Sequence, residues 1–200
     1  MARSSMIYTI GHSNHAAERF GELLRQHAVG AVADVRSTPF SRFNPQFNRR
    51  TLAASLRDGG IHYVFLGDEL GARSKDPACY DAGRVSYAKL ARSEPFRRGL
   101  ERVLGGMQEH RIALMCAERE PLECHRTILV SRELERAGVP VTHILHDGSL
   151  ETHERAMERL IGELRLTGED LFKRHAELIE EAYEVQAARV AYVRDPSATR

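Results

Sequence analysis

The sequence predicts an α/β fold: an open, mostly parallel sheet of about five strands, with helices on both faces and a C-terminal helical extension. Three observations lead to this prediction. Short β-rich segments alternate with longer amphipathic segments, and glycine and proline mark the ends of several of them. Hydrophobic residues make up 42% of the 200-residue chain, which is enough for the core of one ordinary domain.

The strands are expected where β-branched and apolar residues form short runs, at residues 6–10, 31–35, 62–66, 112–115 and 141–145. Helices are expected where apolar residues recur at helical spacing, at residues 14–28, 48–57, 87–108 and 125–137. Pro95 interrupts the third helix, and Gly138 and Pro140 close the fourth. Because strands and helices alternate, right-handed crossovers make successive strands parallel.

Two segments lie outside this alternation. Residues 71–83 form a polar loop that is long for a compact domain, so we expect a mobile lid that exposes Cys79. Residues 151–194 predict two further helices, separated near Thr167. The second has an apolar face that is expected to dock on the core or on a second copy of the chain: Phe172, Ala176, Ile179, Tyr183, Ala187 and Val190. We therefore assign residues 1–150 to the α/β domain and 151–200 to an extension packing on it.

Composition excludes several classes of protein. With 29 basic and 28 acidic residues, the chain has no bulk charge for binding nucleic acid or membranes. Three cysteines are too few for a disulfide scaffold, and no apolar run is long enough to span a bilayer. These features indicate a soluble protein of the reducing cytoplasm. All basic residues except Lys75, Lys89 and Lys173 are arginine, so only local arginine clusters are informative.

Polar and reactive side chains follow the expected strands at their carboxyl ends. Ligands bind at this edge of open α/β sheets, so these side chains are expected to form one site. They carry hydroxyl, imidazole, carboxylate, guanidinium or thiol groups: His12, Ser13, Arg36, Ser41, Arg42, Asp68, Glu69, Cys116, Glu118, Cys124, His125, Arg126, His146 and Asp147.

A dense group of reactive side chains runs from Cys116 to Arg126. Cys124 is expected at the start of a helix, where the helix dipole and its cationic neighbours lower the pKa of the thiol. Cys116 is expected at the end of a buried strand, where burial raises the pKa of its thiol. The two cysteines fit a nucleophile, a redox pair, metal ligands or simple packing. Their seven-residue separation is not the Cys-x2–4-Cys spacing of structural zinc sites, although His12 and His125 could still join them in space.

A second group lies in residues 36–57, which hold five arginines, three phenylalanines and no acidic residue. Guanidinium and aromatic groups together bind phosphates and stack on bases. The alternative is a loop whose phenylalanines pack in the core. Asp34 at the preceding strand end is expected to clamp Arg36, Arg126 or His12. No Walker or dinucleotide-binding glycine motif is present, so the sequence assigns no cofactor.

These residues resemble the domain-of-unknown-function family 488. The resemblance covers roughly residues 6–148 and rests on four ordered motifs: Thr9-Ile10-Gly11-His12-Ser13; Asp34-Val35-Arg36-Ser37 with Pro39 and Ser41-Arg42; Tyr63 with Leu66-Gly67 and Leu70-Gly71; and Cys116-Ala-Glu118 with Cys124-His125-Arg126. Membership implies the α/β fold and one shared site formed by these motifs. It implies no particular activity.

The leading hypothesis is an enzyme or ligand-binding protein acting on a phosphate-bearing substrate, a nucleotide or nucleic acid, at the carboxyl edge of the sheet. Its expected catalytic residues are His12 as general acid or base, Asp34 or Glu118 to orient it, and Cys116, Cys124 and His125 as the thiol centre. Its expected substrate-binding residues are Ser13, Arg36, Ser41, Arg42, Tyr63 and Arg126.

Two alternatives come from other classes of protein. One is a metal-binding or thiol-redox protein that uses Cys116, Cys124, His125 and His12. The other is a non-catalytic adaptor whose C-terminal helix binds a partner. The same helix could also form a homodimer. Neither the substrate, the metal, the pairing of the cysteines nor the oligomeric state follows from the sequence.

Overall fold

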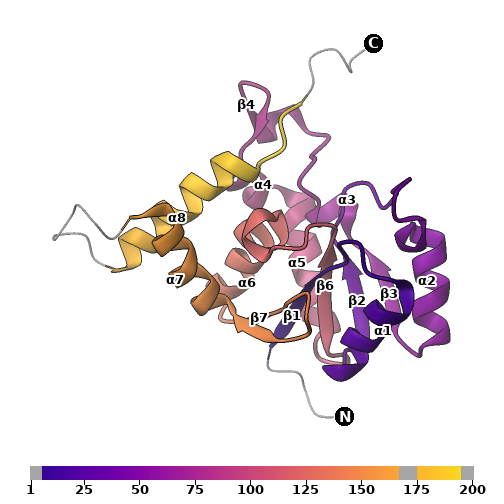
Figure 1. Ribbon diagram of the computed structural model, residues 1–200. Coiled ribbons are helices and arrows are strands. Elements are labelled where there is room, and N and C mark those ends of the chain that lie inside the picture. The colour runs from indigo at the N-terminus through magenta and orange to yellow at the C-terminus, as the bar shows by residue number, and fades with distance from the viewer. Residues whose placement is uncertain (1–5, 167–174, 195–200) are drawn as a thin grey trace.

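The computed structural model describes residues 6–166 and 175–194, and its centre is a six-stranded sheet (Figure 1). The strand order is β3-β2-β6-β1-β7-β8. The bounds are β1 (Ile7–Gly11), β2 (Ala31–Asp34), β3 (His62–Phe65), β6 (Ile112–Cys116), β7 (Val141–Ile144) and β8 (Leu150–Thr152). All neighbours pair in parallel except β7 and β8. The predicted α/β fold is confirmed, and β8 is one strand more than the five expected.

The helices fall close to the predicted segments, with one exception. They are α1 (Ala17–Gln26), α2 (Arg49–Asp58), α3 (Gly67–Leu70), α4 (Tyr87–Arg92), α5 (Glu94–Gly106), α6 (Arg132–Arg136), α7 (His153–Leu164) and α8 (His175–Val190). The exception is α3, which was not expected from the sequence. The break expected at Pro95 falls at Ser93, because the Ser93 Oγ accepts from the Phe96 N–H at 3.4 Å and caps α5. Short 3₁₀ turns are η1 (Pro45–Phe47), η2 (Pro77–Cys79) and η3 (Pro121–Glu123).

A π-helix, η4 (Arg126–Ser131), directly precedes α6. Its wider turn is closed in part by the Ser131 hydroxyl, which donates to the Arg126 carbonyl at 2.7 Å. π-turns inside helices concentrate at functional sites. The sequence predicts a single continuous helix over residues 125–137, because apolar periodicity over so short a segment does not distinguish an α-helix from a π-helix.

The sheet has apolar layers on both faces, as alternation of side chains along its strands requires. One layer packs Ile10, Val32 and Met115 against α1 and α2. The other packs Ile7, Leu114 and Cys116 against α5, η4, α7 and α8. In Figure 1, α7 and α8 accordingly lie on the side of the molecule away from α1 and α2. Cys116 therefore lies on the layer that includes the C-terminal helices.

Residues 71–83 contain more structure than the expected lid. They include η2 and the strand β4 (Tyr80–Asp81), which pairs antiparallel with β5 (Arg84–Val85). The expectation that Cys79 is exposed is wrong: its side chain is 2% exposed. The reason is tertiary packing, since this segment folds over the core cluster that contains Leu90 and Ala191.

The C-terminal helices pack on the sheet through apolar and polar contacts. Ala182 and Tyr183 of α8 are buried in the core, and Ile179, Ala187 and Val190 pack against it. Phe172 and the expected separation near Thr167 lie outside the described residues. Within the described part of the chain, no helix combines the length and apolar character needed to cross a membrane.

Candidate functional site

The carboxyl ends of the three central strands bring most of the predicted site residues to one edge of the sheet. β2, β6 and β1 are neighbours and end at Asp34, Cys116 and Gly11. The His12 N–H donates to the Cys116 carbonyl at 2.8 Å, and the Ser13 N–H donates to the Ala117 carbonyl at 2.9 Å. The loops that follow β1 and β6 are therefore held together by their backbones.

Cys116, Cys124 and His125 form a buried group at this edge, which we call the thiol–imidazole cluster. His125 Nδ1 lies 3.8 Å from the Cys116 Sγ and 3.8 Å from the Cys124 Sγ. All three donor atoms lie within 4.8 Å of one another. Cys116 comes from β6, whereas Cys124 and His125 come from the turn between η3 and η4. Cys116 and Cys124, which seven residues separate in the sequence, therefore lie close together in space.

The proton arrangement of His125 follows from its second ring nitrogen. Nε2 lies 3.0 Å from the Val35 carbonyl oxygen, which can only accept a hydrogen bond. Nε2 therefore carries a proton. Burial lowers the pKa of His125, but the charge of Cys124 and a hydrogen bond with it outweigh burial and raise that pKa, so Nδ1 presents a lone pair to the two sulfur atoms only after losing its own proton. Histidine metal ligands are commonly oriented in this way, by a carbonyl that fixes the opposite nitrogen.

The two thiols differ in their electrostatic surroundings. Burial disfavours the Cys124 thiolate, but a hydrogen bond from Cys116 and the positive charges of Arg126 and His125 outweigh it, and the pKa of Cys124 is lowered. Burial and the neighbouring Cys124 raise the pKa of Cys116. Both directions agree with those predicted from sequence. Cys124 therefore loses its proton more readily than Cys116, and the negative charge of the cluster falls on Cys124 first.

Glu118 and Arg126 complete the surroundings of Cys124. Glu118 Oε2 lies 3.0 Å from the Cys124 Sγ, and burial together with the charge of Cys124 raises the pKa of Glu118. Arg126 is fully buried and donates from Nη1 to the Glu118 carbonyl at 2.7 Å. Gly11 allows this loop to approach, because a Cβ at Gly11 would lie 1.9 Å from the Glu118 carbonyl oxygen.

A second group at the same edge is centred on a buried ion pair. Asp34 accepts from Arg36 Nε at 2.9 Å and from Arg36 Nη2 at 2.6 Å, and the Tyr63 hydroxyl donates to Asp34 at 2.7 Å. Arg36 Nη2 also donates to the Phe47 carbonyl at 2.9 Å. Burial opposes the charge of Arg36, but the hydrogen bond to Asp34 raises its pKa. The predicted clamp of Arg36 by Asp34 is present, so this guanidinium is already paired.

His12 lies between the ion pair and the aromatic core. Its Nε2 is 3.1 Å from Arg36 Nη1, its Nδ1 is 2.9 Å from the Ser13 carbonyl, and its ring stacks on Phe47 with centroids 4.3 Å apart. Burial and the charge of Arg36 lower the pKa of His12 to about 4. His12 is therefore neutral at physiological pH and both of its nitrogens contact protein groups.

The remaining predicted residues lie in loops with local hydrogen bonds. The Ser13 hydroxyl donates to Asn14 at 3.3 Å, and the Ser41 hydroxyl accepts from the Asn44 N–H at 3.0 Å. Arg42 is exposed. From the expected catalytic and substrate-binding residues the structure thus assembles two groups and leaves these three outside them. The first group is Cys116, Glu118, Cys124, His125 and Arg126; the second is His12, Asp34, Arg36 and Tyr63. Four further residues expected at this edge also make their contacts elsewhere: Asp68, Glu69, His146 and Asp147.

A pocket of about 230 Å³ opens beside the cluster, and we call it the cluster pocket. Cys116, Glu118 and His125 line it on the cluster side, whereas Cys124 is only 1% exposed. The other walls come from three separate segments: Arg36, Ser37 and Thr38; Ala72, Arg73 and Tyr87; and Val190 and Tyr192, with Ala117 and Glu123. The pocket therefore connects both groups of predicted residues.

Sequence reasoning missed Tyr87 and Arg73 as site residues. Tyr87 begins α4 and is 6% exposed, yet its hydroxyl has no hydrogen-bond partner among the described residues. The Arg73 guanidinium stacks over the Tyr192 ring at 4.7 Å. Arg73 belongs to residues 71–83, outside the strand–helix alternation, whereas Tyr87 is the first residue of a helix expected from the sequence. The only available signal was the polar character of residues 71–83.

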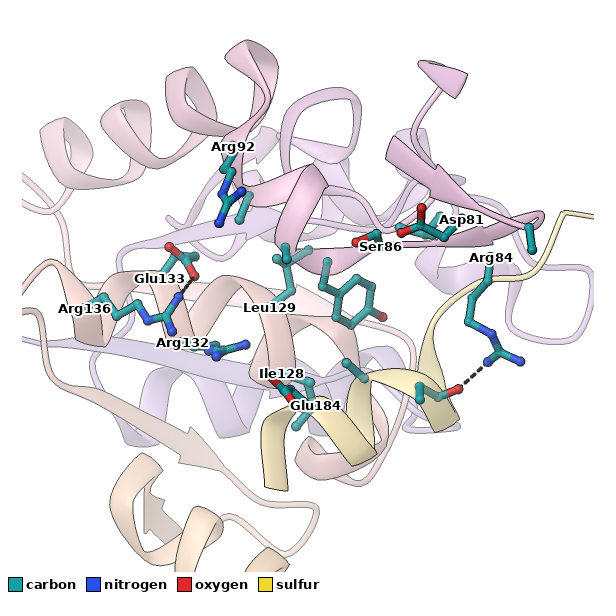
Figure 2. A pocket seen from close by; sticks show the side chains of 17 residues that line it. Asp81, Arg84, Ser86, Arg92, Ile128, Leu129, Arg132, Glu133, Arg136 and Glu184 are labelled. Atoms are coloured by element: carbon teal, nitrogen blue, oxygen red, sulfur yellow. Dashed lines mark hydrogen bonds and ion pairs between the residues drawn. The ribbon is translucent and has the colours of Figure 1, made fainter. Parts of the chain in front are cut away.

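A larger cleft of about 750 Å³ lies between α4, η4 and α8 (Figure 2), and Tyr87 lines this cleft as well as the cluster pocket. Its rim carries arginines that are already engaged: Arg136 pairs with Glu133 at 2.9 Å, and Arg84 donates to the Ala188 carbonyl. None of the site residues predicted from sequence lines it in the described part of the chain. The thiol chemistry therefore belongs to the smaller pocket.

The fold and the cluster define an α/β protein with a thiol–imidazole centre at the carboxyl edge of its sheet. The chain belongs to the family described as Domain of unknown function DUF488, whose model matches residues 16–132. This match includes the motifs that carry Asp34 and Cys124, and it begins after His12. No curated protein and no solved structure matches the chain.

Proposed function

We propose that this is a metal-binding protein whose thiol–imidazole cluster holds a divalent transition-metal ion on Cys116, Cys124 and His125. One observation carries the proposal: Nδ1 of His125 faces two sulfur atoms, each at 3.8 Å, while the Val35 carbonyl fixes the opposite nitrogen. Nδ1 can share one proton with one sulfur atom at a time. A metal ion would engage all three donor atoms together.

The spacing of the donor atoms supports this proposal. With Zn–S bonds of about 2.3 Å and Zn–N bonds of about 2.0–2.1 Å at a tetrahedral angle, sulfur and nitrogen ligands lie about 3.6 Å apart. The observed separations of 3.8 Å differ from this by little. Thiolate and imidazole ligands favour zinc among the common biological metals. The three unpaired cysteines also suit the reducing cytoplasm expected from the sequence.

The buried charges support a cation in the same place. A metal ion would displace the proton of Cys116, and its positive charge would then balance two buried thiolates beside Glu118; Arg126 adds one positive charge, with Nη1 and Nη2 directed at backbone carbonyls. Three protein ligands leave a fourth position for Glu118 or for a molecule in the cluster pocket. Catalytic zinc sites keep such an open position, whereas structural sites have four protein ligands. The proposed role is therefore binding or activation of a small molecule.

The test is metal content. Protein purified without chelators, or reconstituted with zinc, is expected to hold one metal ion per chain by elemental analysis. Cys116→Ser and Cys124→Ser should each lose it, and Cys79→Ala, which changes the remaining cysteine, should retain it. Wild-type protein that stays metal-free after reconstitution would overturn the proposal, and so would retention in both cluster variants. An oxidised mass lower by two hydrogen atoms that reverts with reductant would establish a Cys116–Cys124 redox pair instead.

A second candidate function is binding of single-stranded nucleic acid by the loop after β2. Phe43 is 91% exposed and Phe40 is 64% exposed, which is unusual for phenylalanine. Exposed arginines flank them at Arg42, Arg49 and Arg50. Exposed aromatic faces beside guanidinium groups can stack on bases and contact phosphates. The loop, rather than the paired Arg36, supports the phosphate-directed hypothesis.

Titration with a fluorescent single-stranded oligonucleotide at low salt tests this second function. Phe43→Ala and Arg42→Ala should each weaken binding about tenfold, because a stacked base contributes about 1–3 kcal/mol. Arg57→Ala, at the far end of α2, serves as a matched loss of one positive charge. Equal affinity in wild type and both loop variants would exclude this surface.

A further inference from the structure

We infer that the cluster pocket binds a small oxyanion, a carboxylate or phosphate group, and that the Tyr87 hydroxyl donates a hydrogen bond to it. This inference rests on the proposed metal centre, whose open position the oxyanion would occupy. It adds the chemical class of the ligand and a binding residue that the sequence did not indicate.

The first argument is the hydroxyl of Tyr87. It is buried and has no hydrogen-bond partner among the described residues. Other tyrosines in the structure satisfy theirs: Tyr63 donates to Asp34 at 2.7 Å, Tyr80 donates to the Ser74 carbonyl at 2.7 Å, and the Tyr183 hydroxyl lies 2.6 Å from His153 Nε2. A buried hydroxyl without a partner is costly to the fold. A ligand in the pocket that Tyr87 lines would provide the missing acceptor.

The second argument is that the Tyr87 hydroxyl acts as a hydrogen-bond donor. A tyrosine hydroxyl is protonated over the physiological range and can donate a hydrogen bond. Tyr87 lines the cluster pocket together with Cys116 and Glu118, so it can donate to a ligand bound there. A donor in this place suits an anionic ligand.

The third argument is the charge and size of the cluster pocket. Arg36 is engaged by Asp34, but Arg73 has no carboxylate partner among the described residues and is positioned by stacking on Tyr192. Glu118 and Glu123 also line the pocket, so Arg73 and the metal ion must supply the positive charge that an oxyanion needs there. The backbone N–H of Arg73 donates to the Ser37 Oγ at 2.9 Å, and this hydrogen bond holds the backbone of Arg73 in place at the pocket. A volume of about 230 Å³ is equivalent to roughly seven to eight water molecules. The pocket therefore accommodates a carboxylate or phosphate with a small substituent.

Cobalt(II) substitution provides the test, because the visible absorption of a thiolate-bound cobalt ion changes when its fourth ligand changes. Acetate and inorganic phosphate are titrated separately into the cobalt-loaded protein, and acetamide serves as the neutral control. We expect a saturable spectral shift with at least one of the anions and none with acetamide. The more tightly bound anion identifies the class of oxyanion.

Tyr87→Phe should keep its cobalt and bind the anion about tenfold more weakly, as expected for loss of a hydrogen bond to a charged group. Arg73→Ala should also bind it more weakly. Tyr80→Phe removes a hydroxyl that is satisfied at the Ser74 carbonyl, and it should match wild type.

The outcomes separate this inference from the proposed function. Failure of wild-type protein to bind cobalt would contradict the metal centre itself. A cobalt spectrum that neither anion changes would overturn the oxyanion inference and leave the metal centre in place. Equal anion affinity in wild type and Tyr87→Phe would overturn the role of Tyr87.

Discussion

Acid should destabilise this protein through a buried chain of histidines that joins the C-terminal helix to the sheet. Thr9 Oγ1 lies 2.8 Å from His143 Nδ1, His143 Nε2 lies 3.1 Å from His153 Nδ1, and His153 Nε2 lies 2.6 Å from the Tyr183 hydroxyl. Burial lowers the pKa of His153 to about 4. Burial, the adjacent His153 and nearby arginines lower the pKa of His143 as well. A proton on either ring would place a charge in the apolar layer beneath α8.

The magnitude follows from proton linkage. The pKa of His153 changes from 6.5 when unfolded to about 4 when folded, so the unfolded chain takes up the proton first as the pH falls. The free energy of unfolding therefore decreases as the pH falls below 6.5 and levels off below about 4. For His153 alone the decrease is about 2 kcal/mol between about pH 7 and pH 5, and about 3 kcal/mol in total.

Urea unfolding at these two pH values, followed by circular dichroism, measures the effect. His153→Gln is expected to be less stable than wild type at pH 7, since it disturbs the contacts with His143 and Tyr183. Its loss of stability between pH 7 and pH 5 should be smaller than that of wild type by about 2 kcal/mol. His62→Gln, at an exposed position, is the matched control and should keep the wild-type pH dependence. The reasoning is refuted if His153→Gln loses as much stability on acidification as wild type does.

Three further substitutions test the packing of the site, and Phe43→Ala serves as the control for one of them. Asp34→Asn should lower the free energy of unfolding by about 3–5 kcal/mol, because it leaves a buried guanidinium without its charge partner, and urea unfolding measures this. Phe47→Ala should cost about 3–5 kcal/mol in the same assay, whereas Phe43→Ala at an exposed position should change stability by less than about 0.5 kcal/mol. Gly11→Ala forces the Glu118 loop to move and should cost about 1–3 kcal/mol; zinc titration should also show weaker binding than wild type.

The sequence was sufficient to predict the α/β layers, because periodicity and glycine or proline punctuation act locally. All five expected strands are present. The sixth strand of the main sheet, β8, was missed because it is short. Its residues, Leu150, Glu151 and Thr152, are too few to show an alternation of apolar and polar side chains. It forms because Asp147 accepts from the Ser149 N–H at 2.9 Å and turns the chain back along β7.

The candidate site was predicted at the correct edge of the sheet, but its internal contacts were not. Sequence placed Asp34 at a strand end and Cys116 at another, yet only the observed strand order makes those strands neighbours. The burial of Cys79 and the position of Tyr87 depend on how residues 71–92 fold over the core. Such non-local packing leaves no periodic signal in the chain. The pKa directions of Cys116 and Cys124 were accessible because they depend on strand burial and on adjacent residues.

The sheet itself organises the proposed metal ligands before any ion binds. The Val35 carbonyl that fixes His125 follows β2, the Cys116 thiol belongs to β6, and Gly11 at the end of β1 gives the Glu118 loop its room. These three strands are hydrogen-bonded neighbours. A displacement of β2, β6 or β1 would therefore move the Val35 carbonyl, the Cys116 thiol or the Glu118 loop, respectively. The sheet therefore positions Cys116 directly and His125 through the Val35 carbonyl, whereas Cys124 is carried by the turn between η3 and η4. Zinc has no geometric preference from its d electrons, so it can accept the arrangement that the sheet imposes on these donors.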